Sequence, residues 1–265
     1  MRNQAKHFFD RGWCRFEYDP LLYSWVEAAL APARATLEDP RQARWLRYQG
    51  TWFAGVNALS NDAGGAIGDS GPLRGSAVDF IAEALGLTDF DWDAAQVSIC
   101  YPGYPLPMAG ESPGRTRYRR ESDAAHVDGL LPEGEQRRRH LREHHGFILG
   151  IPMVEFNADA SPFVVWEGSQ EIVREAFVRR FSGLAPELWG EQDITDTYHA
   201  ARRQAFAECK RVELHARPGE AFIAHRLVLH GMAPWREGAA AGDDGRMICY
   251  FRPDTFGPWE WLTSP

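Results

Sequence analysis

The sequence predicts a mainly β fold with flanking helices, of the sandwich or jelly-roll kind. Two observations favour this class. From residue 96 onward, short runs rich in β-branched and aromatic residues are separated by turns containing Gly, Pro, Asn and Asp. Helical patterns are confined to residues 1–95 and to one later stretch, so strands and helices do not alternate as they do in a parallel α/β sheet. The 265 residues are expected to form a single domain.

The N-terminal part is expected to be mainly helical. Asp19 and Pro20 form a typical helix start, since a capping side chain is followed by proline in the first turn. Apolar residues at helical spacing continue to Leu37, and a second helix is expected over residues 77–87. Residues 57–75, rich in Gly, Ser, Asn and Asp, are expected to form a long surface loop.

The expected β core spans residues 96–253. A helical insertion over about residues 170–209 interrupts it, because apolar residues recur there at helical spacing. Residues 105–120 show no apolar periodicity and are expected to form a flexible loop. The strands are expected at residues 96–101, 146–156, 162–166, 211–215, 221–229 and 247–251.

Composition and charge argue against several classes of protein. The 29 Lys and Arg against 37 Asp and Glu give a net charge of −8, which argues against a general nucleic-acid binder. The longest apolar run, residues 146–154, is far shorter than the roughly 20 residues that span a membrane. The N-terminus lacks the apolar segment of a secretion signal, and the four cysteines are scattered without a CxxC pair. A cytoplasmic protein without a disulfide framework is therefore expected.

His126 and Asp128 are the first candidate metal ligands. Residues two apart on an extended segment project to the same side, so this imidazole and carboxylate can occupy neighbouring positions on a divalent metal ion. The triplet by itself is a common pattern, and a surface turn explains it equally well.

A second group of candidates lies near the C-terminus. A Pro-Gly turn at residues 218–219 leads into an apolar run that ends at His230 and Gly231, where glycine lets the backbone pass close to a metal-bound side chain. Arg246 then opens the last predicted strand. A charge in an apolar strand is costly unless an anion meets it. That anion is either a structural carboxylate or a bound ligand.

Taken in order, these elements resemble the phytanoyl-CoA dioxygenase-like family of Fe(II)/2-oxoglutarate-dependent oxygenases, over about residues 96–253. That family carries an HxD motif, a distal His after a Pro-Gly strand, and an Arg at the start of the next strand. The resemblance implies a double-stranded β-helix, that is, a cupin-like jelly roll. It also implies that His126, Asp128 and His230 bind Fe(II). Arg246 and Gln96 would then contact the cosubstrate 2-oxoglutarate.

The implied reaction is oxidation of a small-molecule substrate by dioxygen, with release of succinate and carbon dioxide. Asp128 favours hydroxylation or a related oxidation, because halogenating relatives lack this carboxylate. Neither the substrate nor the oligomeric state can be read from the sequence. The alternative is a cupin-type protein that binds a metal or a sugar without oxygenase turnover. A weaker alternative is a structural β protein in which the HxD triplet is accidental.

The sequence departs from the family pattern in two places. His230 and Arg246 are 16 residues apart, longer than is usual, and residues 237–245 look like the loop insertion responsible. Arg236 and Arg252 are therefore alternatives for the anion-binding role. The family's PGSH stretch is also replaced, by the sequence WEGSQ beginning at Trp166.

The segment before His126 is expected to be a mobile lid over the metal, residues 105–122, or else a variable surface loop. His140 and His144 have the spacing of a zinc pair on a helix, but a solvated helical face explains them better. His225 is expected on the face of its strand opposite His230, and His215 is expected to be an ordinary strand residue. The aromatic residues that line either a pocket or the core include Trp52, Phe53 and Trp166.

Overall fold

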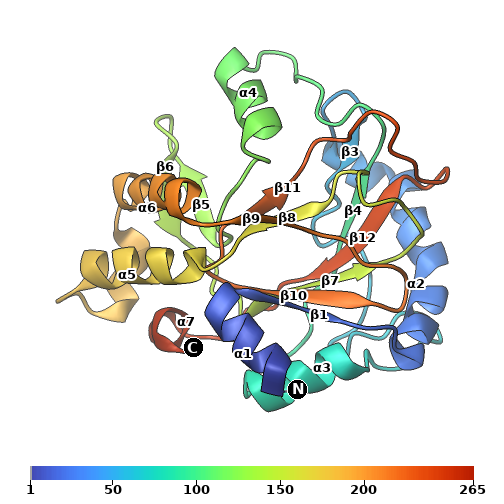
Figure 1. Cartoon of the computed structure of the whole chain (residues 1–265), viewed down its shortest axis with the longest axis horizontal. Coiled ribbons are helices and arrows are strands. Elements are labelled where there is room, and N and C mark those ends of the chain that lie inside the picture. Colours follow the sequence, from blue (N-terminus) through green and yellow to red (C-terminus); the bar gives the residue numbers. More distant parts are fainter. Residues whose placement is uncertain (1) are drawn as a thin grey trace.

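Two antiparallel sheets face each other in the structure, a computed structural model that describes residues 2–265 (Figure 1). The larger sheet has seven strands, in the spatial order β1 (Trp13–Phe16), β10 (Ala221–His225), β7 (Phe147–Pro152), β12 (Arg246–Phe251), β4 (Gln96–Cys100), β3 (Trp52–Phe53) and β2 (Leu46–Arg47). The smaller sheet has three, in the order β11 (His230–Met232), β8 (Phe163–Trp166) and β9 (Arg211–Leu214). Buried side chains from both sheets pack between them, which gives the predicted jelly roll.

Helices cover the outside of this sandwich. The larger sheet is covered on its outer face by α1 (Arg2–Arg11), α2 (Pro20–Glu38) and α3 (Ser76–Ala84), whose buried residues share one core with it. A second core is formed mainly by α5 (Ser169–Phe181), α6 (Thr195–Glu208), α7 (Pro258–Thr263) and the hairpin of β5 (Leu130–Glu133) and β6 (Arg138–Leu141). Helix α4 (Pro113–Glu121) stands apart from these helices, above β11 in Figure 1. Short 3₁₀ helices cover Pro40–Trp45 and Pro186–Glu191.

The side chains of strand β12 alternate between the two faces of the larger sheet. Alternate residues of this strand belong to the helix-covered core, whereas Ile248 and Tyr250 lie between the sheets. The same alternation places Arg246 on the inner side, and Arg252, just past the strand, follows it. The inner face of one strand therefore carries a positive charge at each end.

Most of the predicted elements are confirmed. Helix α2 begins at Pro20, and the Asp19 side chain caps it by accepting a hydrogen bond of 2.9 Å from the Leu21 amide. Each predicted β run contains a strand, and the predicted insertion contains α5 and α6. Residues 57–75 contain neither a helix nor a strand.

The N-terminal part is not only helical, however. Strand β1 pairs with β10, with Trp13 opposite Ala224, and β3 pairs with β4, with Trp52 opposite Cys100. Strands of two to four residues are too short to show a period-2 pattern in the sequence. Pairing with the central strands decides their structure.

Three further expectations are wrong. The predicted strand over residues 221–229 ends at His225, where the Val228 amide donates to the His225 carbonyl and the chain turns toward the other sheet. Residues 105–120 are not without structure, because they contain most of α4. His140 lies on β6 instead of on a helix, because the charged segment folds back as a hairpin with β5.

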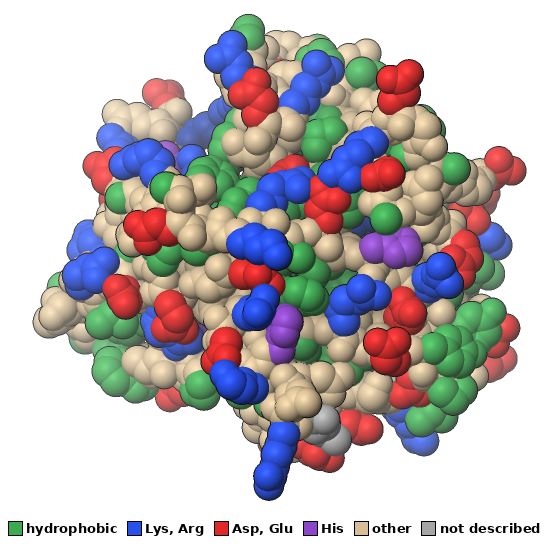
Figure 2. All heavy atoms as spheres, viewed as in Figure 1, with side chains coloured by type: hydrophobic (Ala, Val, Ile, Leu, Met, Phe, Trp, Pro, Cys, Tyr) green, Lys and Arg blue, Asp and Glu red, His purple; other side chains and the backbone are tan. Residues whose placement is uncertain are grey.

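The surface agrees with the composition. On the face shown in Figure 2, basic and acidic side chains are interspersed, so this face carries no continuous basic surface. Among residues 2–265, no helix is both long enough and apolar enough to cross a bilayer.

Candidate active site

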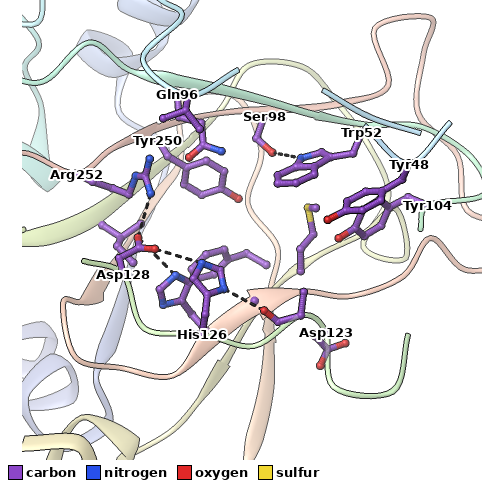
Figure 3. Close-up of a pocket in the computed structure, with 17 residues that line it drawn as sticks. Tyr48, Trp52, Gln96, Ser98, Tyr104, Asp123, His126, Asp128, Tyr250 and Arg252 are labelled. Atoms are coloured by element: carbon purple, nitrogen blue, oxygen red, sulfur yellow. Dashed lines mark hydrogen bonds and ion pairs between the residues drawn. The ribbon is translucent and has the colours of Figure 1, made fainter. Parts of the chain in front are cut away.

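His126, Asp128 and His230 meet where the segment before β5 crosses the start of β11. The His126 amide donates to the His230 carbonyl at 2.7 Å, and the His230 amide donates back to the His126 carbonyl at 3.0 Å. One ligand atom from each of the three side chains lies within 4.8 Å of the others (Figure 3). Gly231 permits this crossing, since a Cβ there would overlap the Asp123 carbonyl.

Backbone carbonyls orient both imidazoles. The Nδ1 atom of His126 lies 3.0 Å from the Ala124 carbonyl, and that of His230 lies 3.0 Å from the Val228 carbonyl. A carbonyl only accepts, so each Nδ1 carries the proton and each Nε2 keeps its lone pair. These Nε2 atoms lie 3.2 Å and 3.7 Å from the Asp128 carboxylate. Fixing the tautomer in this way is how proteins prepare histidines for a metal ion.

The charges in the site also suit a cation. Burial alone would raise the pKa of Asp128, but the positive charge of Arg252 outweighs it and holds this pKa well below its usual value. Burial lowers the pKa of His230 and keeps that imidazole neutral. The site therefore offers an ionised carboxylate beside a neutral imidazole, the protonation states that bind metals.

Arg246 lies in the inner core without an anionic partner. Its side chain is fully buried, and none of the ion pairs within residues 2–265 involves it. One Nη donates to the Tyr250 hydroxyl at 2.9 Å, the other lies 3.6 Å from the Met232 sulfur, and Nε has no partner. Tyr250 and Met232 both line the cavity described below. A buried, unpaired guanidinium at this place fits an incoming carboxylate.

The two alternative arginines lie in different surroundings. Arg236 is at the surface and pairs with Asp159 and Glu213, so it does not face the site. Arg252 lines the cavity, and its Nη1 lies 3.2 Å from Oδ2 of Asp128. This contact could not be predicted from the sequence, because Arg252 and Asp128 are 124 residues apart along the chain.

A cavity of about 350 Å³ opens beside the three candidate ligands. Gln96 lines it from β4, and its amide donates to the Ala54 carbonyl at 2.8 Å. Trp52 also lines the cavity, whereas Phe53 and Trp166 are buried in the two helix-covered cores. Sequence reasoning missed further lining residues, for which no local motif exists: Tyr48, Ser98, Tyr104 and Tyr250.

The remaining histidines lie outside this site. His140 contacts the Gly190 carbonyl at 3.2 Å, and His144 packs against Trp261.

His225 is buried near α5, where its Nε2 accepts from Arg174 at 3.2 Å. His215 follows β9 and contacts the Phe156 carbonyl at 2.9 Å.

The segment expected to be a lid is anchored at several points. Within residues 105–122, Arg119 is buried in an ion pair with Glu111. Its guanidinium also lies 4.1 Å from the centre of the Tyr48 ring. The Tyr118 hydroxyl donates to the Ala125 carbonyl at 2.6 Å. The lack of apolar periodicity in this segment does not leave it without buried contacts, and its movement stays a prediction.

Comparisons with known proteins identify the fold. No family model matches the chain, and no curated protein matches it at a significant level. Among solved structures it is similar to the non-heme alpha ketoglutarate dependent carbocyclase SnoK from nogalamycin biosynthesis, with a TM-score of 0.52, 14% identity, and coverage of 95% of this chain and 84% of SnoK. The epimerase SnoN gives a TM-score of 0.53 and 16% identity, over 95% of this chain and 80% of SnoN. A second SnoN structure, with Fe3+, alpha ketoglutarate and nogalamycin RO, gives 0.51 and 15%, over 95% and 83%. The chain thus shares the jelly-roll fold of these enzymes.

Proposed function

We propose that this chain is an Fe(II)- and 2-oxoglutarate-dependent dioxygenase that oxidises a small-molecule substrate. The convergence of His126, Asp128 and His230 carries the proposal, with two free Nε2 atoms and one ionised carboxylate around a single point. His126, Asp128 and His230 would hold the iron as a set of two histidines and one carboxylate, which would leave room on the ion for the cosubstrate and dioxygen. That arrangement is typical of non-haem Fe(II) oxygenases.

Arg246 would bind the distal carboxylate of 2-oxoglutarate. Its guanidinium is buried without a carboxylate partner and contacts Tyr250 and Met232, which line the cavity. Its planar fork matches a carboxylate in two-point contact. Gln96, opposite Tyr250 on the neighbouring strand β4, is a second candidate contact for the cosubstrate.

When bound, iron and 2-oxoglutarate supply the oxidising chemistry: dioxygen gives one oxygen atom to succinate, formed with carbon dioxide, and the other to a hydroxylated substrate. The protein's own groups prepare the place for this reaction. Arg252 orients Asp128, and the Phe163 ring lies nearly parallel to His230, with centroids 5.4 Å apart. This apolar ring keeps water away from His230, whose side chain is buried.

Absorption spectroscopy under nitrogen tests the proposal. Adding Fe(II) and 2-oxoglutarate to the wild-type protein is expected to produce the weak visible charge-transfer band of their chelate. The band should be lost in His126→Ala and His230→Ala. His140→Ala serves as the matched control, because this histidine lies outside the site, and should keep the band.

A screen for succinate release over metabolite pools, after dioxygen is admitted, then tests turnover. Iron binding without the band in the wild-type protein would overturn the proposal and would instead indicate a cupin-type metal-binding protein. A band that survives in His126→Ala would show that the iron site lies elsewhere.

A further inference from the structure

The cavity has two chemically different ends. His126, Asp128 and His230 lie at one end, and an aromatic wall formed by Tyr48, Trp52 and Tyr104 lies at the other (Figure 3). A substrate held between them would place one part at the metal ligands and another against the rings. What the wall can recognise therefore indicates the class of substrate, and this reasoning rests on the function proposed above.

Two rings of the aromatic wall are stacked on one another, and the third stands upright beside them. The rings of Tyr48 and Trp52 are nearly parallel, with an angle of 5° between their planes and centroids 5.7 Å apart. Tyr104 stands at 62° to the first ring and 63° to the second, with centroids 5.9 Å and 6.2 Å away. Tyr48 therefore stacks on one face of Trp52, and Tyr104 stands upright beside both rings.

The wall is held in place from behind. Trp52 is on β3, paired with β4, and its Nε1 donates to the Ser98 hydroxyl at 3.0 Å. Tyr48 carries the Arg119 guanidinium on its ring, and Arg119 is itself fixed by its ion pair with Glu111. These contacts fix the rings before any ligand binds, so a matching ligand loses little affinity to ordering them.

We propose that the substrate is a planar ring system, aromatic or conjugated, that carries a carbonyl or hydroxyl oxygen. A flat ring that continues this stack lies with its whole face on the part of Trp52 that lines the cavity, and meets Tyr104 at an angle. A puckered saturated ring of the same size touches the Trp52 ring at fewer atoms and loses dispersion energy at each gap.

Two phenol groups of the wall are the reason for proposing an oxygen substituent on the ligand's ring. Neither the Tyr48 nor the Tyr104 hydroxyl has a hydrogen-bond partner within residues 2–265, and both rings line the cavity. In Figure 3 both rings lie on the side of the cavity away from Asp128. Burial raises the pKa of Tyr104, which keeps this phenol protonated and able to donate. A ligand oxygen would provide the missing partner.

A cationic ligand is the competing interpretation, because aromatic cages also bind quaternary ammonium groups. The charges around the wall disfavour it. Of the two carboxylates that line the cavity, Asp123 pairs with Arg211 at 2.6 Å and 2.9 Å, and Asp128 pairs with Arg252. A further guanidinium already lies on Tyr48. No unpaired carboxylate in the cavity's lining is left for a cation.

Matched probes test the ring preference by calorimetry on the metal-free protein. The probes are 2-naphthol and decahydro-2-naphthol, which share a skeleton but differ in flatness, and tetramethylammonium. We expect 2-naphthol to bind about tenfold more tightly than its saturated counterpart, the effect of one well-placed aromatic pair. Trp52→Leu should abolish this difference and Trp52→Phe should keep it. Trp259→Leu is the control, since Trp259 is 55% exposed and outside the cavity.

Several results would overturn the proposal. These are equal affinity for the flat and puckered probes, no binding of 2-naphthol, preferential binding of tetramethylammonium, and a ring preference unchanged by Trp52→Leu. Tyr48→Phe should weaken 2-naphthol but not naphthalene, and equal effects on both would refute the oxygen contact. The probes need neither iron nor 2-oxoglutarate, so a missing charge-transfer band would refute the oxygenase function without touching this result.

Discussion

Replacing Arg252 by glutamine would test how the site balances the charge of Asp128 before any metal binds. The side chains of these two residues are 18% and 9% exposed, and Nη1 lies 3.2 Å from Oδ2. Removing one partner of a buried ion pair costs about 3–5 kcal/mol, because the other charge is left in a poorly solvated place. Both residues keep some contact with the cavity, so we expect the lower end, about 3 kcal/mol.

In a domain of this size, about 3 kcal/mol corresponds to a fall of roughly 6–12 °C in Tm. A divalent ion bound by His126, Asp128 and His230 would supply the missing positive charge. Adding Mn(II) with 2-oxoglutarate should therefore raise the Tm of Arg252→Gln by more than it raises that of the wild type. Thermal unfolding followed by circular dichroism, with and without the metal, measures both quantities.

Two controls make the result specific to the pair. Arg236→Gln breaks a surface pair and should cost at most about 1 kcal/mol, with no dependence on metal. Asp128→Asn combined with Arg252→Gln should be less destabilised than the sum of the two single variants, since neither charge is left alone. An equal loss of stability with and without metal, or simple additivity of the two changes, would refute the reasoning.

Three further outcomes are expected. Arg246→Lys keeps the charge but loses the two-point match, so the apparent KM for 2-oxoglutarate should rise tenfold or more while iron affinity is unchanged; an unchanged KM would move this role to Arg252. Burial opposes protonation of His145, but Asp254 and Glu143, 3.2 Å and 3.1 Å away, outweigh it and raise its pKa to about 9. This pKa is higher than that of a histidine in the unfolded chain, so the charged imidazole stabilises the fold at low pH. His145→Gln should therefore lower the free energy of unfolding by about 1–2 kcal/mol below pH 6.5. Chemical denaturation should show this difference disappearing as the pH rises through 9. Hydrogen exchange in residues 105–122 should slow only when iron, 2-oxoglutarate and a ring ligand are all bound, and equal exchange in both states would mean that the segment is merely a connection.

The sequence alone identified the residues whose signal is local. His126 and Asp128 share one side because an extended chain alternates with period two, and Arg246 is conspicuous as a charge that opens an apolar strand. The strands after residue 96 were predictable for the same reason, since each carries its own β-rich pattern between turn residues. Such features depend only on near neighbours in the chain.

Tertiary structure decided everything that depends on distant segments meeting. The contact of Arg252 with Asp128 joins residues 124 apart, and the aromatic wall of Tyr48, Trp52 and Tyr104 is formed by a turn, a two-residue strand and a loop. None of these residues carries a local motif, because an isolated tyrosine or a very short strand looks the same in a core, at a surface or in a cavity. Their position is set by which strands pair and which faces pack, and only the folded chain determines that.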